Sequence, residues 1–125
     1  MITEFELNES SKDDEVDQFH ELLESMNDTK LVVAYFYAPW CGPCKVLSPM
    51  VQSLVETEFQ EQSVKVIKIN LDDFQDLGQD LRIAKLPAMV LFSNGEEKQR
   101  LFGLKTKDEL KKKFIKVLDP SQSES

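Results

Sequence analysis

Two cysteines, Cys41 and Cys44, are the only ones in the chain, and Gly42 and Pro43 separate them. Thiols at this spacing can form a disulfide or supply half of a zinc site. A zinc site takes four ligands, and His20 is the single histidine that could join the pair, so we expect no metal. We also expect no cofactor. A purely structural disulfide would close a very short loop and add little stability. We therefore interpret the pair as redox-active, with the zinc site and the structural disulfide as alternatives.

The residues on either side of the pair predict a strand followed by a helix. Leu31–Tyr37 is a continuous apolar run, typical of a strand that is buried on both faces. Pro39 interrupts that run, and we expect a helix from Cys44 to about Phe59, kinked at Pro49. The cysteine pair is thus predicted to lie where a buried strand turns into a helix.

This position has consequences for the chemistry of each sulfur. Cys41 should lie exposed at the N-terminal end of the helix, where unpaired N–H groups and the helix dipole favour an anion. The pKa of its thiol should therefore be lowered. Gly42 and Pro43 should allow a tight turn in which the two sulfurs meet. Cys44, one turn into the helix, would then attack a mixed disulfide formed on Cys41.

The remaining elements follow from apolar periodicity and turn residues. We expect strands at Ile2–Leu7, Val64–Leu71, Ala88–Phe92 and Gln99–Phe102, and helices at Asp13–Met26, Asp72–Leu81 and Lys105–Leu118. Asn94-Gly95 predicts a hairpin between the last two strands. This order predicts an α/β fold with a mixed sheet of about five strands flanked by about four helices. Residues 1–125 are interpreted as one domain, with 119–125 as a frayed polar tail.

The negative charge of the chain is concentrated at its N-terminal end. The net charge is −8, and residues 1–30 carry ten acidic residues against two lysines, whereas residues 31–125 are neutral overall. We interpret the acidic region as a solvated helix face, the alternative being a surface that steers partners. Nucleic acid and anionic membranes are disfavoured as partners by repulsion. The first residues lack the features of a signal peptide, so we expect a cytoplasmic protein, unless a leader has already been removed.

Several segments together resemble the thioredoxin family. The run Tyr37–Lys45 is similar to the active-site segment of that family, residue for residue. Further matches at compatible spacing are Pro49, Lys68, Leu86-Pro87-Ala88 and Gly103. The resemblance covers about residues 2–118 and implies the thioredoxin fold.

The resemblance also implies roles for individual residues. Cys41 would be the attacking thiolate and Cys44 the resolving thiol of a protein-disulfide reductase. The residues expected to contact substrate are Trp40, Gly42, Pro43, Leu86, Pro87 and Gly103, with Trp40 exposed and the bond before Pro87 cis. The implied partners are disulfide-containing proteins and a flavoprotein thioredoxin reductase, with no nucleic acid and no membrane, and we expect a monomer.

One position departs from the family pattern. Thioredoxins usually carry a buried aspartate six residues before the first active-site cysteine, and this chain has Tyr35 there. The hydroxyl of Tyr35 is neutral near pH 7 and can serve only as a hydrogen-bond partner. Lys68 therefore lacks its expected carboxylate, and both residues are expected to tune the site. Either solvent accepts the proton of Cys44 instead, or the protein is retuned for other partners.

Two other functions remain as alternatives to protein-disulfide reduction. A thioredoxin-fold binding or assembly module with incidental redox activity is favoured only by Tyr35 and the acidic N-terminal region. Reduction of insulin in the presence of dithiothreitol distinguishes that module from a reductase. Net disulfide oxidation or isomerisation is disfavoured, because family oxidases and isomerases more often carry histidine between the cysteines.

Overall fold

The elements of the chain follow the order predicted from the sequence. The computed structural model describes residues 2–59 and 63–122. In chain order its elements are β1 (Ile2–Glu4), α1 (Glu15–Ser25), β2 (Leu31–Tyr37), α2 (Gly42–Glu58), β3 (Val64–Asn70), α3 (Gln75–Asp80), β4 (Ala88–Ser93), β5 (Glu96–Phe102), α4 (Lys107–Leu118) and the 3₁₀ turn η1 (Pro120–Gln122). The predicted α/β fold is confirmed, and η1 is an addition to it.

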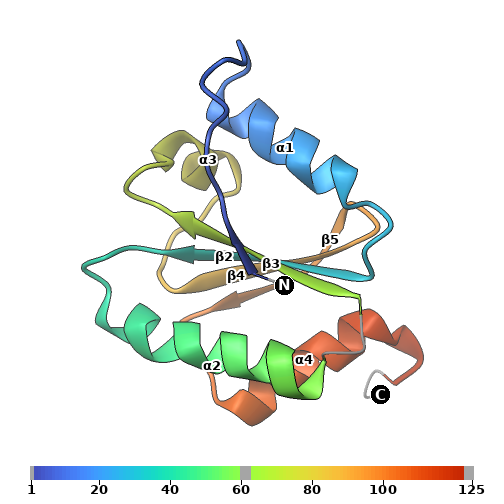
Figure 1. Cartoon of the computed structure of the whole chain (residues 1–125). Helices are drawn as coiled ribbons and strands as arrows, with labels where there is room; N and C mark the ends of the chain where they lie inside the picture. Colours follow the sequence, from blue (N-terminus) through green and yellow to red (C-terminus); the bar gives the residue numbers. More distant parts are fainter. Residues whose placement is uncertain (1, 60–62, 123–125) are drawn as a thin grey trace.

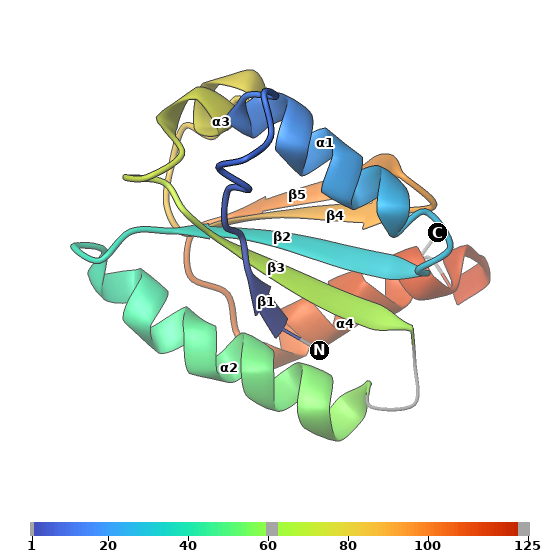
Figure 2. The same ribbon diagram turned by 45° about the horizontal axis from the view of Figure 1, so that its top comes forward.

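A five-stranded mixed sheet with β2 at its centre forms the middle of the molecule. The strand order is β1-β3-β2-β4-β5; β1, β3 and β2 are parallel, and β4 and β5 run antiparallel to their neighbours. Helices α1 and α3 cover one face of the sheet, and α2 and α4 cover the other (Figures 1 and 2). Because β2 and β3 are parallel neighbours, the loops after them meet at the same edge of the sheet.

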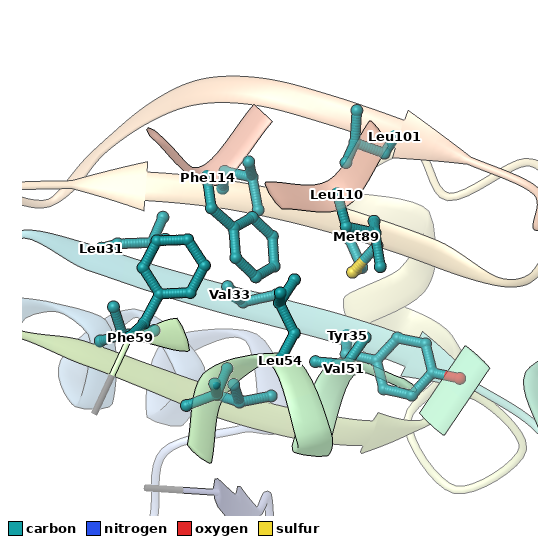
Figure 3. Close-up of a cluster of buried hydrophobic side chains, with 14 of the residues drawn as sticks. Leu31, Val33, Tyr35, Val51, Leu54, Phe59, Met89, Leu101, Leu110 and Phe114 are labelled. Carbon is teal, nitrogen blue, oxygen red and sulfur yellow. The ribbon is translucent and has the colours of Figure 1, made fainter. Parts of the chain in front are cut away.

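The core consists of two layers separated by the sheet. Odd-numbered residues of β2 from Leu31 to Tyr35 pack against α2 and α4, in the cluster of Figure 3. Even-numbered residues from Val32 to Phe36 pack on the side of α1 and α3. All six are buried, which confirms the prediction of a strand buried on both faces. Burial of one large apolar side chain stabilises a fold by about 1.5–3 kcal/mol, so β2 and the turn after it are firmly anchored.

The acidic N-terminal region includes a helix that presents its charges to solvent. Phe19 and Leu23 of α1 are buried, whereas Asp17, Glu21 and Glu24 are exposed. This exposure agrees with the interpretation of a solvated helix face. No helix within residues 2–59 and 63–122 has the length and apolar character needed to cross a membrane.

Most boundary differences have a local cause. The first strand ends at Glu4 rather than Leu7. Strand β5 begins at Glu96 rather than Gln99. Its first three residues are polar and exposed, so the alternation of apolar and polar residues that predicted the strand is missing there. Helix α4 begins at Lys107 rather than Lys105, because Thr106 caps it and forms a reciprocal capping box with Glu109.

The C-terminal segment also differs from the prediction of a frayed tail. Residues 120–122 form η1 rather than an unstructured end. The backbone N–H and the hydroxyl of Ser121 both donate hydrogen bonds to the carboxylate of Asp119. Residues 123–125, the rest of the predicted tail, lie outside the described residues.

Candidate active site

The cysteine pair lies just after the central strand, at the first turn of α2. Cys41 is the N-cap residue of α2, and its Sγ accepts a hydrogen bond from the backbone N–H of Cys44 at 3.2 Å. A disulfide joins the two residues, whose Cα atoms are 5.3 Å apart. Because the sulfur of Cys41 takes the place that a capping oxygen usually has, the helix begins at Gly42 rather than at Cys44.

The two sulfurs do not differ in exposure as predicted. Cys41 is 6% exposed and Cys44 is 3% exposed in the oxidised pair. The expectation of an exposed Cys41 is therefore wrong for this state, since both residues pack into one small cluster with Ala38. What distinguishes Cys41 is its capping position, which directs backbone N–H groups at its sulfur.

Gly42 and Pro43 are exposed at the start of α2 and form the tight turn in which the two sulfurs meet, but this turn does not use a positive φ at Gly42. Among the described glycines, Gly95 and Gly103 have positive φ, and Gly42 does not. A Cβ added to Gly42 would meet no atom within 4 Å. The turn between the cysteines therefore does not require the conformational freedom of glycine. Pro43 fits the first turn of a helix, where its missing N–H would have no helical partner in any case.

The loop before β4 completes the surface around the pair. The Leu86–Pro87 peptide bond is cis, and Leu86 packs against the cluster of Ala38, Cys41 and Cys44. The carbonyl of Pro87 accepts a hydrogen bond from the N–H of Gly103 at 2.8 Å. Leu86, Pro87 and Gly103 are thus brought to the cysteines from two loops that are far apart in the sequence.

Trp40 is fixed by a residue that the sequence analysis did not single out. Its side chain is 70% exposed, which confirms the predicted exposure, and its Nε1 donates to Oδ1 of Asp72 at 3.1 Å. Asp72 follows β3, and the parallel pairing of β2 and β3 brings it beside the end of β2. The sequence places Asp72 after a strand, but only the pairing of that strand with β2 shows that Asp72 lies beside Trp40.

Tyr35 lies beneath the first turn of α2 and binds its backbone. The residue is 1% exposed, and its hydroxyl donates to the carbonyl of Cys44 at 3.0 Å. The hydroxyl of Ser48 donates in turn to the oxygen of Tyr35 at 3.2 Å. Figure 3 shows the ring at one end of the cluster, with its hydroxyl directed away from the aliphatic side chains. Burial raises the pKa of Tyr35 while the bond from Ser48 opposes that change, so the group stays neutral near pH 7.

Lys68 faces an aromatic ring and a small pocket rather than a carboxylate. Its Nζ lies 4.9 Å from the ring centroid of Tyr37, within the range of a cation–π contact. The hydroxyl of Tyr37 donates to Oε2 of Glu4 at 2.6 Å. A pocket of about 310 Å³ is lined by Tyr37, Ala38, Pro39, Cys44, Lys45, Ser48, Pro49 and Lys68. None of these residues carries a carboxylate, so within the described part of the chain the pocket beside Cys44 is basic.

The tyrosines should titrate abnormally in the folded protein. Burial raises the pKa of Tyr35, and burial together with the hydrogen bond to Glu4 raises that of Tyr37. The folded protein should therefore show little tyrosinate absorbance at about pH 10, where an ordinary tyrosine is half ionised. In the unfolded chain both groups ionise near that pH, so the free energy of unfolding should fall as the pH rises above about 10.

Spectrophotometric titration with and without urea measures this difference directly, because Tyr35 and Tyr37 are the only tyrosines in the chain. The variant Tyr37→Phe leaves Tyr35 as the sole reporter. Normal titration of that variant in the absence of urea would show that the Tyr35 hydroxyl is not buried under α2.

Comparison with known proteins connects this geometry to a family. The thioredoxin family model matches residues 10–116. The chain is 42% identical over 82 residues to a thioredoxin of Chlamydia caviae, covering 66% of this chain and 78% of that protein. It is 39% identical over 92 residues to the mitochondrial thioredoxin-2 of Schizosaccharomyces pombe, covering 74% of this chain and 67% of that protein.

A solved structure shows the same arrangement of elements. The thioredoxin of Nicotiana alata superimposes with a TM-score of 0.74 at 30% identity, covering 93% of this chain and 91% of that one. The alternative of a binding module with incidental redox activity is not favoured by these similarities. Because the family match spans both cysteines and the loop of Pro87, the chain belongs to the thioredoxin family and is a thiol–disulfide oxidoreductase that reduces protein disulfides.

Proposed function

We propose that Cys41 is the attacking thiolate and Cys44 the resolving thiol. The observation that carries this assignment is the hydrogen bond from the N–H of Cys44 to Sγ of Cys41 at the start of α2. In the reduced protein, the same N–H group and the helix dipole would stabilise a thiolate on Cys41 and lower its pKa. Within the described residues, no hydrogen bond from a backbone N–H group reaches the sulfur of Cys44.

The reaction then proceeds in two exchange steps. The thiolate of Cys41 attacks one sulfur of a substrate disulfide, whose other sulfur leaves and takes up a proton from solvent. Cys44, once deprotonated, attacks Sγ of Cys41, and the mixed disulfide breaks to release the second substrate thiol. Two electrons pass to the substrate, and the disulfide between Cys41 and Cys44 remains as the product state. A dithiol reductant must restore the pair before the next cycle.

The surface proposed to bind substrate surrounds the pair. It comprises Trp40, Gly42, Pro43, Leu86, Pro87 and Gly103. In the described part of the chain, no hydrogen bond engages the backbone N–H or carbonyl of Leu86. These groups are available to pair with an extended segment of substrate, in the manner of an added strand. A flat aromatic ring at Trp40 would cover the segment from the other side.

Tyr35 and Lys68 are proposed to tune the second step. Tyr35 holds the carbonyl of Cys44 and provides no proton acceptor, so the proton of Cys44 would leave to solvent through the adjoining pocket. Lys68 lines the same pocket, and its positive charge would favour the thiolate form of Cys44.

We also propose a reductant, a cellular location and an assembly state for the protein. We place the protein in the cytoplasm as a monomer, with residues 1–125 acting as one domain and a flavoprotein thioredoxin reductase restoring the dithiol. The family resemblance supports the reductase, since a dithiol reductant is needed to close the cycle.

The assignment of the two cysteines can be tested by alkylation. Limiting iodoacetamide at about pH 7 should modify Cys41 of the reduced protein well before Cys44, because the thiolate is the reactive form. Peptide mass mapping measures the order. The same reaction in urea is the control, where the two thiols should react alike. Labelling of Cys44 first in the folded protein would exchange the two roles.

A further inference from the structure

Two loops at one side of the cysteine pair are basic in an otherwise acidic protein. Residues 82–87 and 103–106, named here the basic loops, contain Arg82, Lys85 and Lys105 and no acidic residue. The net charge of the whole chain is −8. A local excess of positive charge therefore lies at the loops that carry Leu86, Pro87 and Gly103.

Lys85 lies directly beside one residue of the proposed substrate surface, Gly103. Its Nζ and Cε lie 3.7 and 3.8 Å from the point that a Cβ on Gly103 would occupy. The side chain thus crosses from one basic loop to the other and lies along Gly103. Lys85 also directly precedes Leu86, whose side chain packs against the cysteines.

The ammonium group of Lys85 is unpaired among the residues that the structure describes. It takes part in none of the ion pairs formed within residues 2–59 and 63–122. Lys105, in contrast, lies near Glu109 and helps to lower the pKa of that carboxyl group, after the hydrogen bonds from Thr106. Among the described residues, the charge of Lys85 is therefore available for a bound segment.

The opposite side of the cysteine pair carries the opposite charge. The sheet order places the loop after β3 on one side of β2 and the loop before β4 on the other. Asp72 and Asp73 lie in the first of these loops, and Asp72 holds Trp40. A substrate segment crossing the pair would therefore meet carboxylates at one end and Lys85 at the other.

We infer that Lys85 is a specificity-determining residue that favours protein disulfides with an aspartate or glutamate on the side of Gly103. This inference rests on the proposed substrate surface and names the class of segment that the surface prefers. Exposed charge pairs are weak and screened by salt, so the preference should be about two- to fivefold in kcat/KM and should fade at high ionic strength. The overall charge of the protein repels acidic peptides, so a preference for them must come from a local cation.

Two synthetic peptides provide the test. Each contains one intramolecular disulfide and carries two charged residues on the side of it that would lie toward Gly103, both aspartate in one peptide and both lysine in the other. With dithiothreitol as reductant at low salt, kcat/KM should be higher for the acidic peptide. Lys85→Gln should remove the preference for the acidic peptide, and Lys85→Glu should shift the ratio further toward the basic peptide. Lys30→Gln is the matched control, because Lys30 is exposed beside the opposite end of β2 and should leave the ratio as it is.

The possible results of this experiment distinguish a failure of the role of Lys85 from a failure of the proposed active site. A wild-type preference for the basic peptide, or a ratio that Lys85→Glu leaves unchanged, would overturn the role of Lys85 while reduction itself stands. Failure of the wild-type protein to reduce either peptide faster than dithiothreitol alone would instead remove the proposed site, and the inference with it.

Discussion

Cys41→Ser should reduce insulin no faster than dithiothreitol alone. Serine is itself a favoured N-cap residue, so α2 should still begin at Gly42 and the variant should fold. Its hydroxyl cannot act as a thiolate, so no mixed disulfide can form and the first exchange step is lost. The turbidity of precipitating insulin B chain measures the rate. Activity well above the dithiothreitol background would show that Cys41 is not the attacking residue.

Cys44→Ser is the matched control, since it removes the other sulfur from the same turn. This variant keeps the thiol of Cys41 and can attack, but nothing in the protein can resolve the product. We expect it to accumulate covalent complexes with insulin chains that are visible on a non-reducing gel and disappear with dithiothreitol. Accumulation in Cys41→Ser instead would mean that Cys44 attacks first.

Tyr35→Asp should be markedly less stable than the wild-type protein. The change truncates an aromatic side chain that is 1% exposed, a type of loss that costs about 3–5 kcal/mol. It also places a carboxyl group in an apolar site, where desolvation raises its pKa above the unfolded value of about 4. The folded protein then holds a proton that the unfolded chain releases. The free energy of unfolding should therefore fall further as the pH rises from that value to the folded pKa.

Urea denaturation between about pH 6 and about pH 9 measures this loss. Lys68, which pairs with position 35 across β2 and β3, should offset part of the loss once the carboxyl group is ionised. The new carboxylate of Tyr35→Asp would provide a proton acceptor near Cys44. Stopped-flow measurement of turnover should therefore show that the variant resolves the mixed disulfide no more slowly than the wild-type protein.

Tyr35→Phe is the control for the ring. It keeps the buried aromatic surface and removes the hydroxyl, so the carbonyl of Cys44 and the hydroxyl of Ser48 lose a partner. Loss of such a buried hydrogen bond costs about 1–3 kcal/mol, with no pH dependence near neutrality. If Tyr35→Asp were as stable as the wild-type protein throughout this pH range, position 35 would not be buried under the active site.

The parts of the site that lie on one continuous segment could be predicted from the sequence. The apolar run of β2 and the breakers after it fix where the strand ends, and the cysteines follow within a few residues. The burial of alternate β2 residues in two layers follows from the parallel arrangement, which needs helices on both faces. These features depend on local periodicity, which a single sequence records.

The contacts that were missed all depend on pairing between distant segments. The bond between Trp40 and Asp72 exists because β2 and β3 are parallel neighbours, which brings together two loops separated by a helix and a strand. The bond from Ser48 to Tyr35 requires α2 to pack over β2 in a definite register. Burial of Cys41 depends on the contact with Leu86, from a third segment. Sequence spacing carries no record of these distances.

Gly42 lies next to open space, so the fold itself does not require a glycine at this position. A Cβ at this position would meet no atom within 4 Å, so a side chain could stand between the cysteines without a clash at its first carbon. A side chain at position 42 would therefore be met by a docking protein rather than by the scaffold. The chemistry of the pair can consequently diverge by exchange of a single exposed residue, while every buried contact of the domain stays in place.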